Sequence, residues 1–215
     1  MAAIIVHFTI RDSIEVPRPT AQVTRFGNLR LVSLFAVFFF LQVGMESTFG
    51  AWISTYVLRT ARTAVTFAAG AAAIYWAGFL LSRALSPLIL LRIRPSRLLQ
   101  TAVITALGAA TLLVVSSSLP ILAAAILLLG IALAPIFPVA LAAFFDRARH
   151  SSDSRFVLAV SGFGGSVFPA LVGWISSYSG SLRMALIAGP ATLLVMTAIL
   201  PLLKVSQSES SPTSP

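Results

Sequence analysis

Glu46 lies in the middle of one of the most apolar stretches of the sequence, between LRLVSLFAVFFFLQ and FGAWISTYVL. Gln42 precedes it by one helical turn on the same face, and Trp52 and Tyr56 extend roughly that stripe. Carboxyl and amide groups bond hydroxyls, and aromatic rings stack on sugar rings, so the pattern is typical of a pocket for a polar solute. In such apolar surroundings we expect Glu46 to be protonated, which suits proton-coupled transport.

Two other interpretations of Glu46 stay open. The protonated carboxyl could simply bond a neighbouring helix. Alternatively, the apolar segment could end earlier than it appears to, so that Glu46 lies at its boundary.

Arg83 is the other ionisable residue well inside an apolar segment. Its side chain could extend to the membrane surface, or bond carbonyls or acidic groups at the ends of adjacent helices. Asp146, in AFFDRARH directly after a later segment, is a candidate partner. We therefore expect a structural or gating role for Arg83 rather than direct contact with substrate.

Two prolines, Pro135 and Pro138, lie within the apolar segment GIALAPIFPVALAAFF. Each removes a backbone donor, which is tolerated in a membrane only where protein or a water-filled cavity replaces it. The pair predicts a kinked or locally unwound helix. Such a helix either lines a substrate cavity or is a simple packing kink.

The composition predicts an all-α, polytopic membrane protein. The 215 residues are 58% hydrophobic and only 10% charged, against about 25% charged in soluble domains. An apolar run of ~20 residues crosses the hydrocarbon core. Runs of that length predict six transmembrane helices in a region covering residues 31–203, at 31–57, 64–90, 98–117, 120–142, 156–179 and 182–203.

The basic residues between these segments predict the orientation. Eleven fall on the side of both termini and three on the other, so the positive-inside rule gives cytoplasmic termini (N-in and C-in). We expect a multi-pass protein of the bacterial inner (cell) membrane. The eleven are Arg11, Arg18, Arg25, Arg30, Arg92, Arg94, Arg97, Arg147, Arg149, Arg155 and Lys204, and the three are Arg59, Arg62 and Arg183.

Several functions have little support in the sequence. There is no cysteine, and His7 and His150 are isolated and lie outside the segments, so we expect no metal site and no cofactor. No catalytic arrangement of Ser, His and Asp and no phosphate-binding loop occurs, so we expect no enzyme. The net charge of +9 is spread over short loops, which excludes nucleic acid as a partner and favours the lipid bilayer.

Four stretches resemble the second half of a major facilitator superfamily transporter, of the fucose permease and sugar-transporter-like branch. LQVGMESTFGAWISTYV is similar to the seventh helix of that branch, and AIYWAGFLLSRALSPLIL with RIRPSRLL to the eighth helix and its basic turn. LGIALAPIFPVALAAF resembles the tenth helix and SGFGGSVFPALVGWISS the eleventh. The resemblance spans about residues 31 to 203.

This resemblance implies two six-helix lobes with a solute site between them near the bilayer midplane, and alternating access by rocking one lobe against the other. It implies that Gln42, Glu46 and Trp52 line the cavity and that the segment from Pro135 to Pro138 flanks it. The cytoplasmic gate would then hold four arginines, Arg83, Arg92, Arg94 and Arg97.

Only one lobe is present. The polar leader 1–30 resembles the family's central linker, and the Ser/Pro-rich tail 204–215 is expected to be disordered. We expect a lobe that transports a small polar solute, such as a sugar, together with a second lobe or as a homodimer. The alternative is a non-transporting membrane fragment or scaffold from a truncated transporter gene.

Overall fold

The computed structural model describes residues 28–61, 65–148 and 151–203, and within these ranges it consists of eight helices without a strand. The helices form six segments that are long and apolar enough to cross a membrane, as the sequence predicted. The chain is an integral, multi-pass membrane protein. The helices are α1 (Leu29–Thr60), α2 (Val65–Leu90), α3 (Pro95–Val115), α4 (Leu119–Leu133), α5 (Ile136–Phe145), α6 (Ser151–Ser179), α7 (Leu182–Leu186) and α8 (Ala188–Leu203).

Short-range features explain where several helices begin. The side chain of Asn28 accepts a hydrogen bond from the backbone N–H of Leu31, which caps α1. Pro95 and Pro120 occupy the first turns of α3 and α4, where a proline costs no helical hydrogen bond. The fourth span consists of α4 and α5, and the sixth of α7 and α8.

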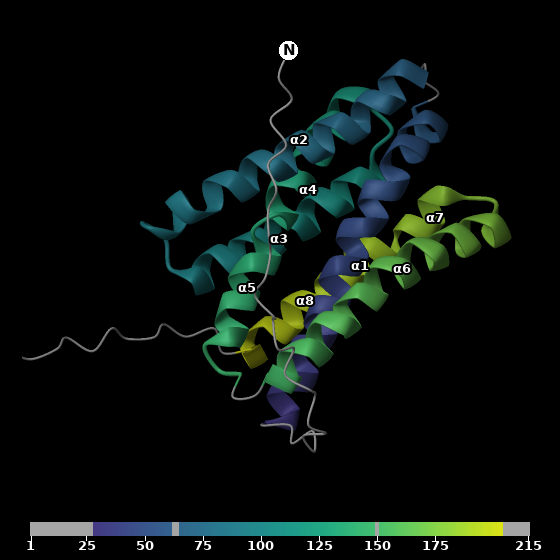
Figure 1. Cartoon of the computed structure of the whole chain (residues 1–215). Coiled ribbons are helices and arrows are strands. Elements are labelled where there is room, and N and C mark those ends of the chain that lie inside the picture. The colour runs from purple at the N-terminus through teal and green to yellow at the C-terminus, as the bar shows by residue number, and fades with distance from the viewer. Residues whose placement is uncertain (1–27, 62–64, 149–150, 204–215) are drawn as a thin grey trace, which may run out of the picture.

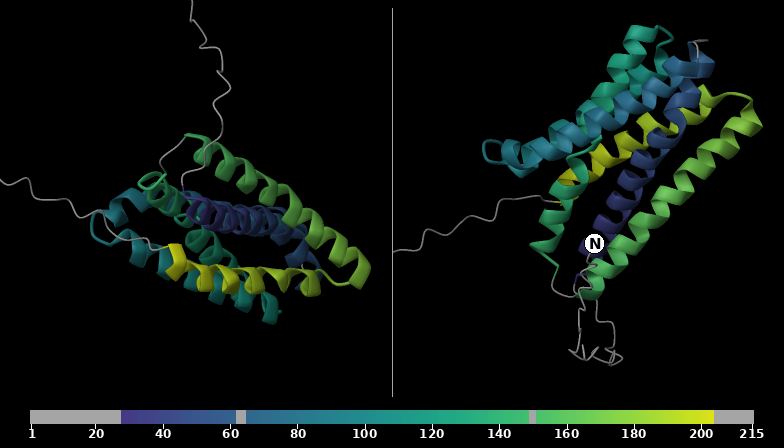
Figure 2. Two further views of the ribbon diagram at one scale, coloured as in Figure 1. Left: turned by 90° about the horizontal axis from the view of Figure 1, so that it is seen from below. Right: turned by 45° about the horizontal axis from the view of Figure 1, so that its top comes forward.

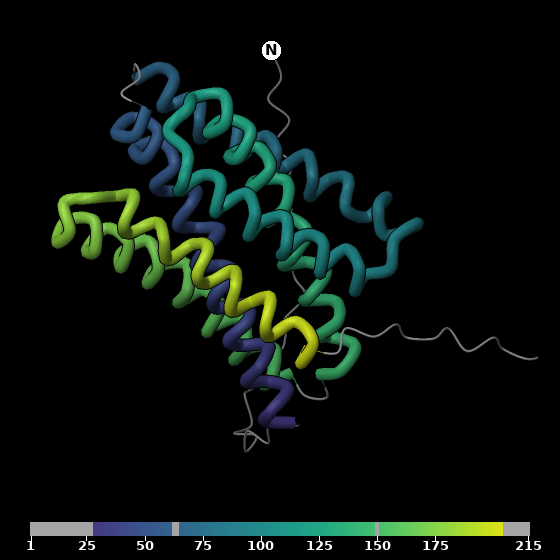
Figure 3. The backbone as a smooth tube through the Cα atoms, turned by 180° about the vertical axis from the view of Figure 1, so that it is seen from behind, coloured from purple at the N-terminus to yellow at the C-terminus, as the bar shows by residue number. Residues whose placement is uncertain are grey.

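The helices fall into two groups whose directions are inclined to each other (Figure 1). In one group α1 lies along α6 and also contacts α8; in the other α4 contacts both α2 and α3. The two further views keep α1 and α6 side by side (Figure 2), and the view from behind shows α8 near α3 (Figure 3). Helix α1 runs through the centre, and its large buried side chains include Phe35, Phe38, Phe39, Met45 and Phe49.

Two glycines allow helices to approach closely within this core. A Cβ atom at Gly164 of α6 would collide with the backbone carbonyl oxygen of Phe40 in α1, and one at Gly130 of α4 with that of Tyr75 in α2. Lipid provides no hydrophobic drive between helices, so such close backbone contact stabilises each pair through dispersion. These two contacts fix α6 on α1 and α4 on α2.

Each of two helices exposes a stripe of small residues at four-residue spacing. On α6 these are Gly162, Ser166 and Ala170, and on α2 they are Ala69, Ala73 and Ala77. In the most apolar stretch of α6 only 22% is buried inside the protein, the lowest share of any span in the described ranges. Small residues are typical of helix contacts in membranes, whereas lipid-facing surfaces carry large apolar side chains.

The arginine-rich leader and the tail cannot be compared with the structure. The leader up to residue 27, the tail 204–215, and the predictions for Arg11, Arg18, Arg25, Arg62, Arg149, His7, His150 and Lys204 lie outside the described residues.

Candidate functional site

The fourth span is interrupted where the sequence predicted a kink. Helix α4 ends at Leu133 and α5 begins at Ile136, with Pro135 between them. Pro135 and Pro138 lack the N–H groups that would bond the carbonyl oxygens of Ile131 and Ala134 in a continuous helix. The break therefore leaves backbone acceptors inside the span.

Side chains from two other helices bond the carbonyls at this break. The Ser82 hydroxyl of α2 donates to the carbonyl oxygen of Ile131 at 2.7 Å, and Nε2 of Gln42 in α1 donates to that of Leu133 at 3.1 Å. Within the described residues, Oε1 of Gln42 is buried without a hydrogen-bond partner. Gln42 thus holds the broken span against α1, while its amide oxygen accepts no hydrogen bond.

Glu46 lies half-buried near the middle of α1, beside two polar residues of α2. The Tyr75 hydroxyl donates to the backbone carbonyl oxygen of Glu46 at 3.2 Å. The guanidinium of Arg83 is close enough to interact electrostatically with both Glu46 and Tyr75. We call these three residues the Glu46 cluster.

The direction of the helices points the two charged side chains of the cluster toward each other, although within the described residues no ion pair joins Glu46 to Arg83, which is exposed. Successive helices α1 and α2 run antiparallel, and side chains lean toward the N-terminus of their own helix. Glu46 therefore leans toward the start of α1 and Arg83 toward the start of α2, which shortens the distance between them. The Cζ atom of Arg83 lies 4.7 Å from the centroid of the Phe79 ring, a cation–π contact that holds the guanidinium in place.

Trp52 and Tyr56, the other aromatic candidates, bond helices on other sides of α1. The indole N–H of Trp52 donates to the carbonyl oxygen of Pro169 in α6 at 3.0 Å. The Tyr56 hydroxyl donates to the carbonyl oxygen of Leu113 at 2.9 Å, at the end of α3, and Tyr56 is fully buried. The structure therefore does not gather Gln42, Trp52 and Tyr56 around Glu46.

The candidate gate residues lie at one end of the lobe, apart from Arg83. Arg92, Arg94 and Arg97 are exposed in the turn from α2 to α3 and at the start of α3. Asp146 is exposed at the end of α5, and no ion pair joins it to Arg83 within the part of the chain that is described. We call this end of the lobe the Arg92 end, and the opposite end, where α1 finishes, the Arg59 end.

Two residues of the site were not identified from the sequence, Ser82 and Tyr75. Pro135 indicates that the carbonyl oxygen of Ile131, four residues earlier, lacks its helical hydrogen bond. It does not indicate which hydroxyl donates to that oxygen instead. Tyr75 lies within an alanine-rich run and carries no local signal of its own. Among the residues that the structure describes, no group of three His, Cys, Asp or Glu could hold a metal ion.

The arrangement couples a carboxyl, a fixed cation and a broken helix inside the membrane. Ionisable groups at this depth are costly and are retained mainly where they bind, conduct or gate. The carboxyl of Glu46 can bond a hydroxyl or exchange a proton. The break between α4 and α5 supplies a point about which the fourth span can bend.

The fold is similar to that of a known transporter. One matching structure is the crystal structure of a variant of the fucose:proton symporter FucP of E. coli, with a TM-score of 0.73 and 14% sequence identity. The match covers 84% of this chain and 44% of that one, so this chain spans less than half of the symporter. No family model and no curated protein matches the sequence.

Proposed function

We propose that this chain, which has the fold of one six-helix half of a major facilitator superfamily transporter, carries a small polar solute such as a sugar across the membrane. Transport proceeds by alternating access against a second six-helix lobe. The observation that carries the proposal is the likeness of nearly the whole described chain to part of a solute:proton symporter. The solute and its coupling to protons are inferred from the Glu46 cluster.

The need for a second lobe is supported by the two uncovered stripes of small residues. Gly162, Ser166 and Ala170 on α6 are exposed, as are the three alanines on α2. Exposed small residues at helical spacing favour close contact with further helices over contact with lipid. The lobe that covers them is either a separate chain or a second copy of this one.

The Glu46 cluster supplies the ionisable groups that the proposed proton coupling needs. A half-buried carboxyl that changes its protonation can link solute movement to a proton gradient. The break at Pro135 gives the fourth span a bend next to Gln42. Movement of α5 would therefore be transmitted to α1 through the hydrogen bond of Gln42. Arg92, Arg94 and Arg97 are proposed to close the cytoplasmic side.

Uptake measurements test the proposal. Cells that produce the chain together with a separate six-helix partner lobe should accumulate at least one member of a panel of radiolabelled monosaccharides. Cells producing either lobe alone should not. A protonophore should abolish the accumulation, because the gradient drives it.

Two other outcomes of the uptake measurement would change the proposal. If the two lobes form a stable complex but no solute accumulates, the chain is a non-transporting fragment or scaffold. If the chain alone accumulates the sugar and purifies as a dimer, the second lobe is another copy of itself.

The orientation of the lobe is tested separately. We propose that both termini are cytoplasmic, in a bacterial inner membrane, because the Arg92 end holds most of the loop arginines. Alkaline phosphatase fused after Pro215 should therefore be inactive, and a green fluorescent protein at the same position should fluoresce. An active phosphatase at this position would reverse the orientation and place Arg92 outside.

A further inference from the structure

Trp76 is an exposed aromatic residue near the middle of the 26-residue helix α2. Tryptophan in membrane proteins is enriched at the two ends of a span, at the level of the lipid headgroups. Trp174 fits that pattern, since it lies near the end of α6, is 66% exposed and stacks on Tyr178. Trp76 is 40% exposed but lies too deep in its span for such a role.

The ring of Trp76 is held beside the Glu46 cluster. It makes edge-to-face contacts with Tyr75 and Phe79, at centroid distances of 5.1 and 5.4 Å. On α1, a Cβ atom at Gly50 would lie 2.7 Å from Cζ2 of Trp76, so the glycine leaves room for the ring. Gly50 follows Glu46 by four residues on the same face of α1. The Trp76 ring therefore lies about one helical turn from Glu46.

Trp76 lies on the face of α2 that we assign to the second lobe. It follows Ala73 by three residues and precedes Ala77, two members of the exposed alanine stripe. Most other large exposed side chains of α2 lie about 120–180° from Trp76 around the helix, and these are Phe67, Ile74, Leu81, Leu85 and Leu88. The latter have the character of a lipid-facing surface, so Trp76 points away from the lipid side of the helix.

The indole N–H of Trp76 is an unused donor. Within the described residues it makes no hydrogen bond, whereas the N–H of Trp52 donates to the carbonyl oxygen of Pro169. A polar group without a partner is costly at this depth, where lipid offers no acceptor. An exposed, unpaired indole beside a carboxyl is therefore suited to a ligand that has both polar groups and an apolar face.

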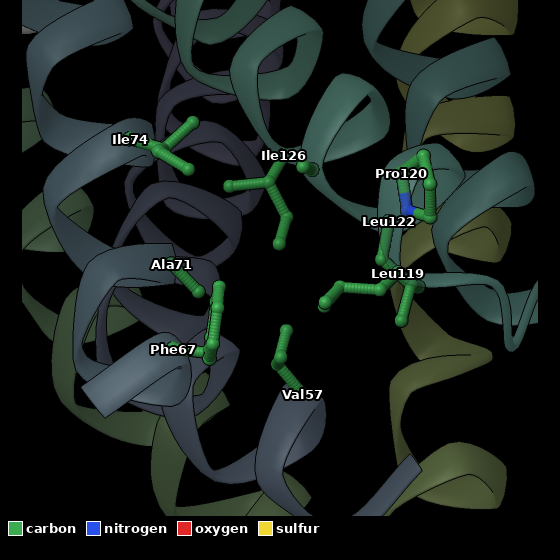
Figure 4. Close-up of a pocket in the computed structure, with 9 residues that line it drawn as sticks. Val57, Phe67, Ala71, Ile74, Leu119, Pro120, Leu122 and Ile126 are labelled. Carbon is green, nitrogen blue, oxygen red and sulfur yellow. The ribbon is translucent and has the colours of Figure 1, made fainter. Parts of the chain in front are cut away.

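The groove at the Arg59 end does not have this character. Val57 of α1, Ala71 of α2 and Ile126 of α4 are among the residues that line it (Figure 4). Its volume is about 310 Å³ and its lining is wholly apolar. A polar solute would find no hydrogen bond there, in contrast to the surface formed by Trp76 and Glu46.

We propose that Trp76 is the surface on which the ring of a cyclic sugar stacks, with the Glu46 carboxyl bonding a hydroxyl of the same molecule. This assignment rests on the proposed function and narrows its solute to a sugar in ring form. The indole offers a flat apolar surface to the C–H face of a pyranose ring, and the carboxyl provides orientation. An open-chain polyol has the same hydroxyls but no ring face.

Uptake kinetics of Trp76 variants test the stacking. The probe is the radiolabelled monosaccharide that cells with the wild-type pair of lobes accumulate fastest. Trp76→Ala should raise the KM for uptake about tenfold or more, whereas Trp76→Phe, which keeps an aromatic face, should retain most of the affinity. Trp174→Ala is the matched control and should leave the KM unchanged. A purely structural role for Trp76 would lower the maximal rate and not the KM, and an unchanged KM in Trp76→Ala would overturn the proposal.

Competition in the wild-type pair needs no variant to fold. Unlabelled sorbitol, an open-chain polyol, should inhibit uptake of the labelled sugar at least about tenfold more weakly than the unlabelled sugar does. Trp76→Ala should remove most of that preference. Equal inhibition by sorbitol in the wild-type pair would overturn the assignment of a ring sugar while leaving transport itself intact. Failure of the wild-type pair to accumulate any monosaccharide would instead overturn the proposed function, and this assignment with it.

Discussion

Gly164→Ala should destabilise the lobe by about 1–3 kcal/mol, and by more if α6 cannot shift. The added methyl group would meet the backbone carbonyl oxygen of Phe40 rather than a flexible side chain. Backbone atoms cannot turn aside, so α6 must move away from α1 along the most extensive helix contact of the lobe. The measurement is the midpoint of thermal unfolding of the purified protein in detergent, followed by circular dichroism.

Gly162→Ala is the matched control on the same helix. A Cβ atom at Gly162 would meet no other atom within 4 Å. Alanine favours a helix over glycine by about 1 kcal/mol, so this change should leave the midpoint unchanged or raise it. If both variants unfold at the same temperature, the close approach of α6 to α1 is wrong.

Glu46→Gln should reduce proton-driven accumulation of the solute about a hundredfold or more, the size of effect expected for loss of a proton-transfer group. Glutamine keeps the shape and hydrogen bonding of the protonated acid but cannot release a proton. Exchange of labelled for unlabelled solute across the membrane needs no net proton movement, and should continue. Both rates are measured in vesicles that contain the paired lobes.

Glu46→Asp is the control, because it keeps a carboxyl one methylene shorter. It should retain part of the driven accumulation, with the loss depending on how well the shorter side chain reaches Arg83. Unchanged accumulation in Glu46→Gln would remove the coupling role and leave Glu46 as a packing residue. Loss of exchange together with accumulation would instead place Glu46 in solute binding.

The number and extent of the spans could be predicted from the sequence because they depend on local composition. The first was expected at 31–57 and forms Leu29–Thr60, and the third was expected at 98–117 and forms Pro95–Val115. The break at Pro135 was also predictable, since a proline removes its hydrogen bond whatever surrounds it. The fold of one transporter lobe, inferred from the order of four motifs, is confirmed by the structural likeness.

The positions of the site residues were harder to predict. Gln42, Trp52 and Tyr56 were grouped on one stripe of α1, but a stripe over 100° wide can face several neighbours in a bundle. Each of the three donates to a different helix: α4, α6 and α3. Which helix meets which face is decided by glycine contacts such as Gly164 with Phe40, which a single sequence does not encode locally. The roles of these residues in solute binding remain predictions.

The two hydrogen bonds across the broken span also constrain how the protein is made. Ser82 and Gln42 belong to helices that leave the ribosome before the carbonyls of Ile131 and Leu133 that they bond. The donors are therefore already in the bilayer when the fourth span, with its unpaired backbone, enters it. A chain whose second helix had not inserted would expose the Ile131 carbonyl to lipid, at a cost of several kcal/mol for an unsatisfied group. The order of the helices along the chain thus supports stepwise insertion, and a defect in the first two spans should appear as degradation of the fourth.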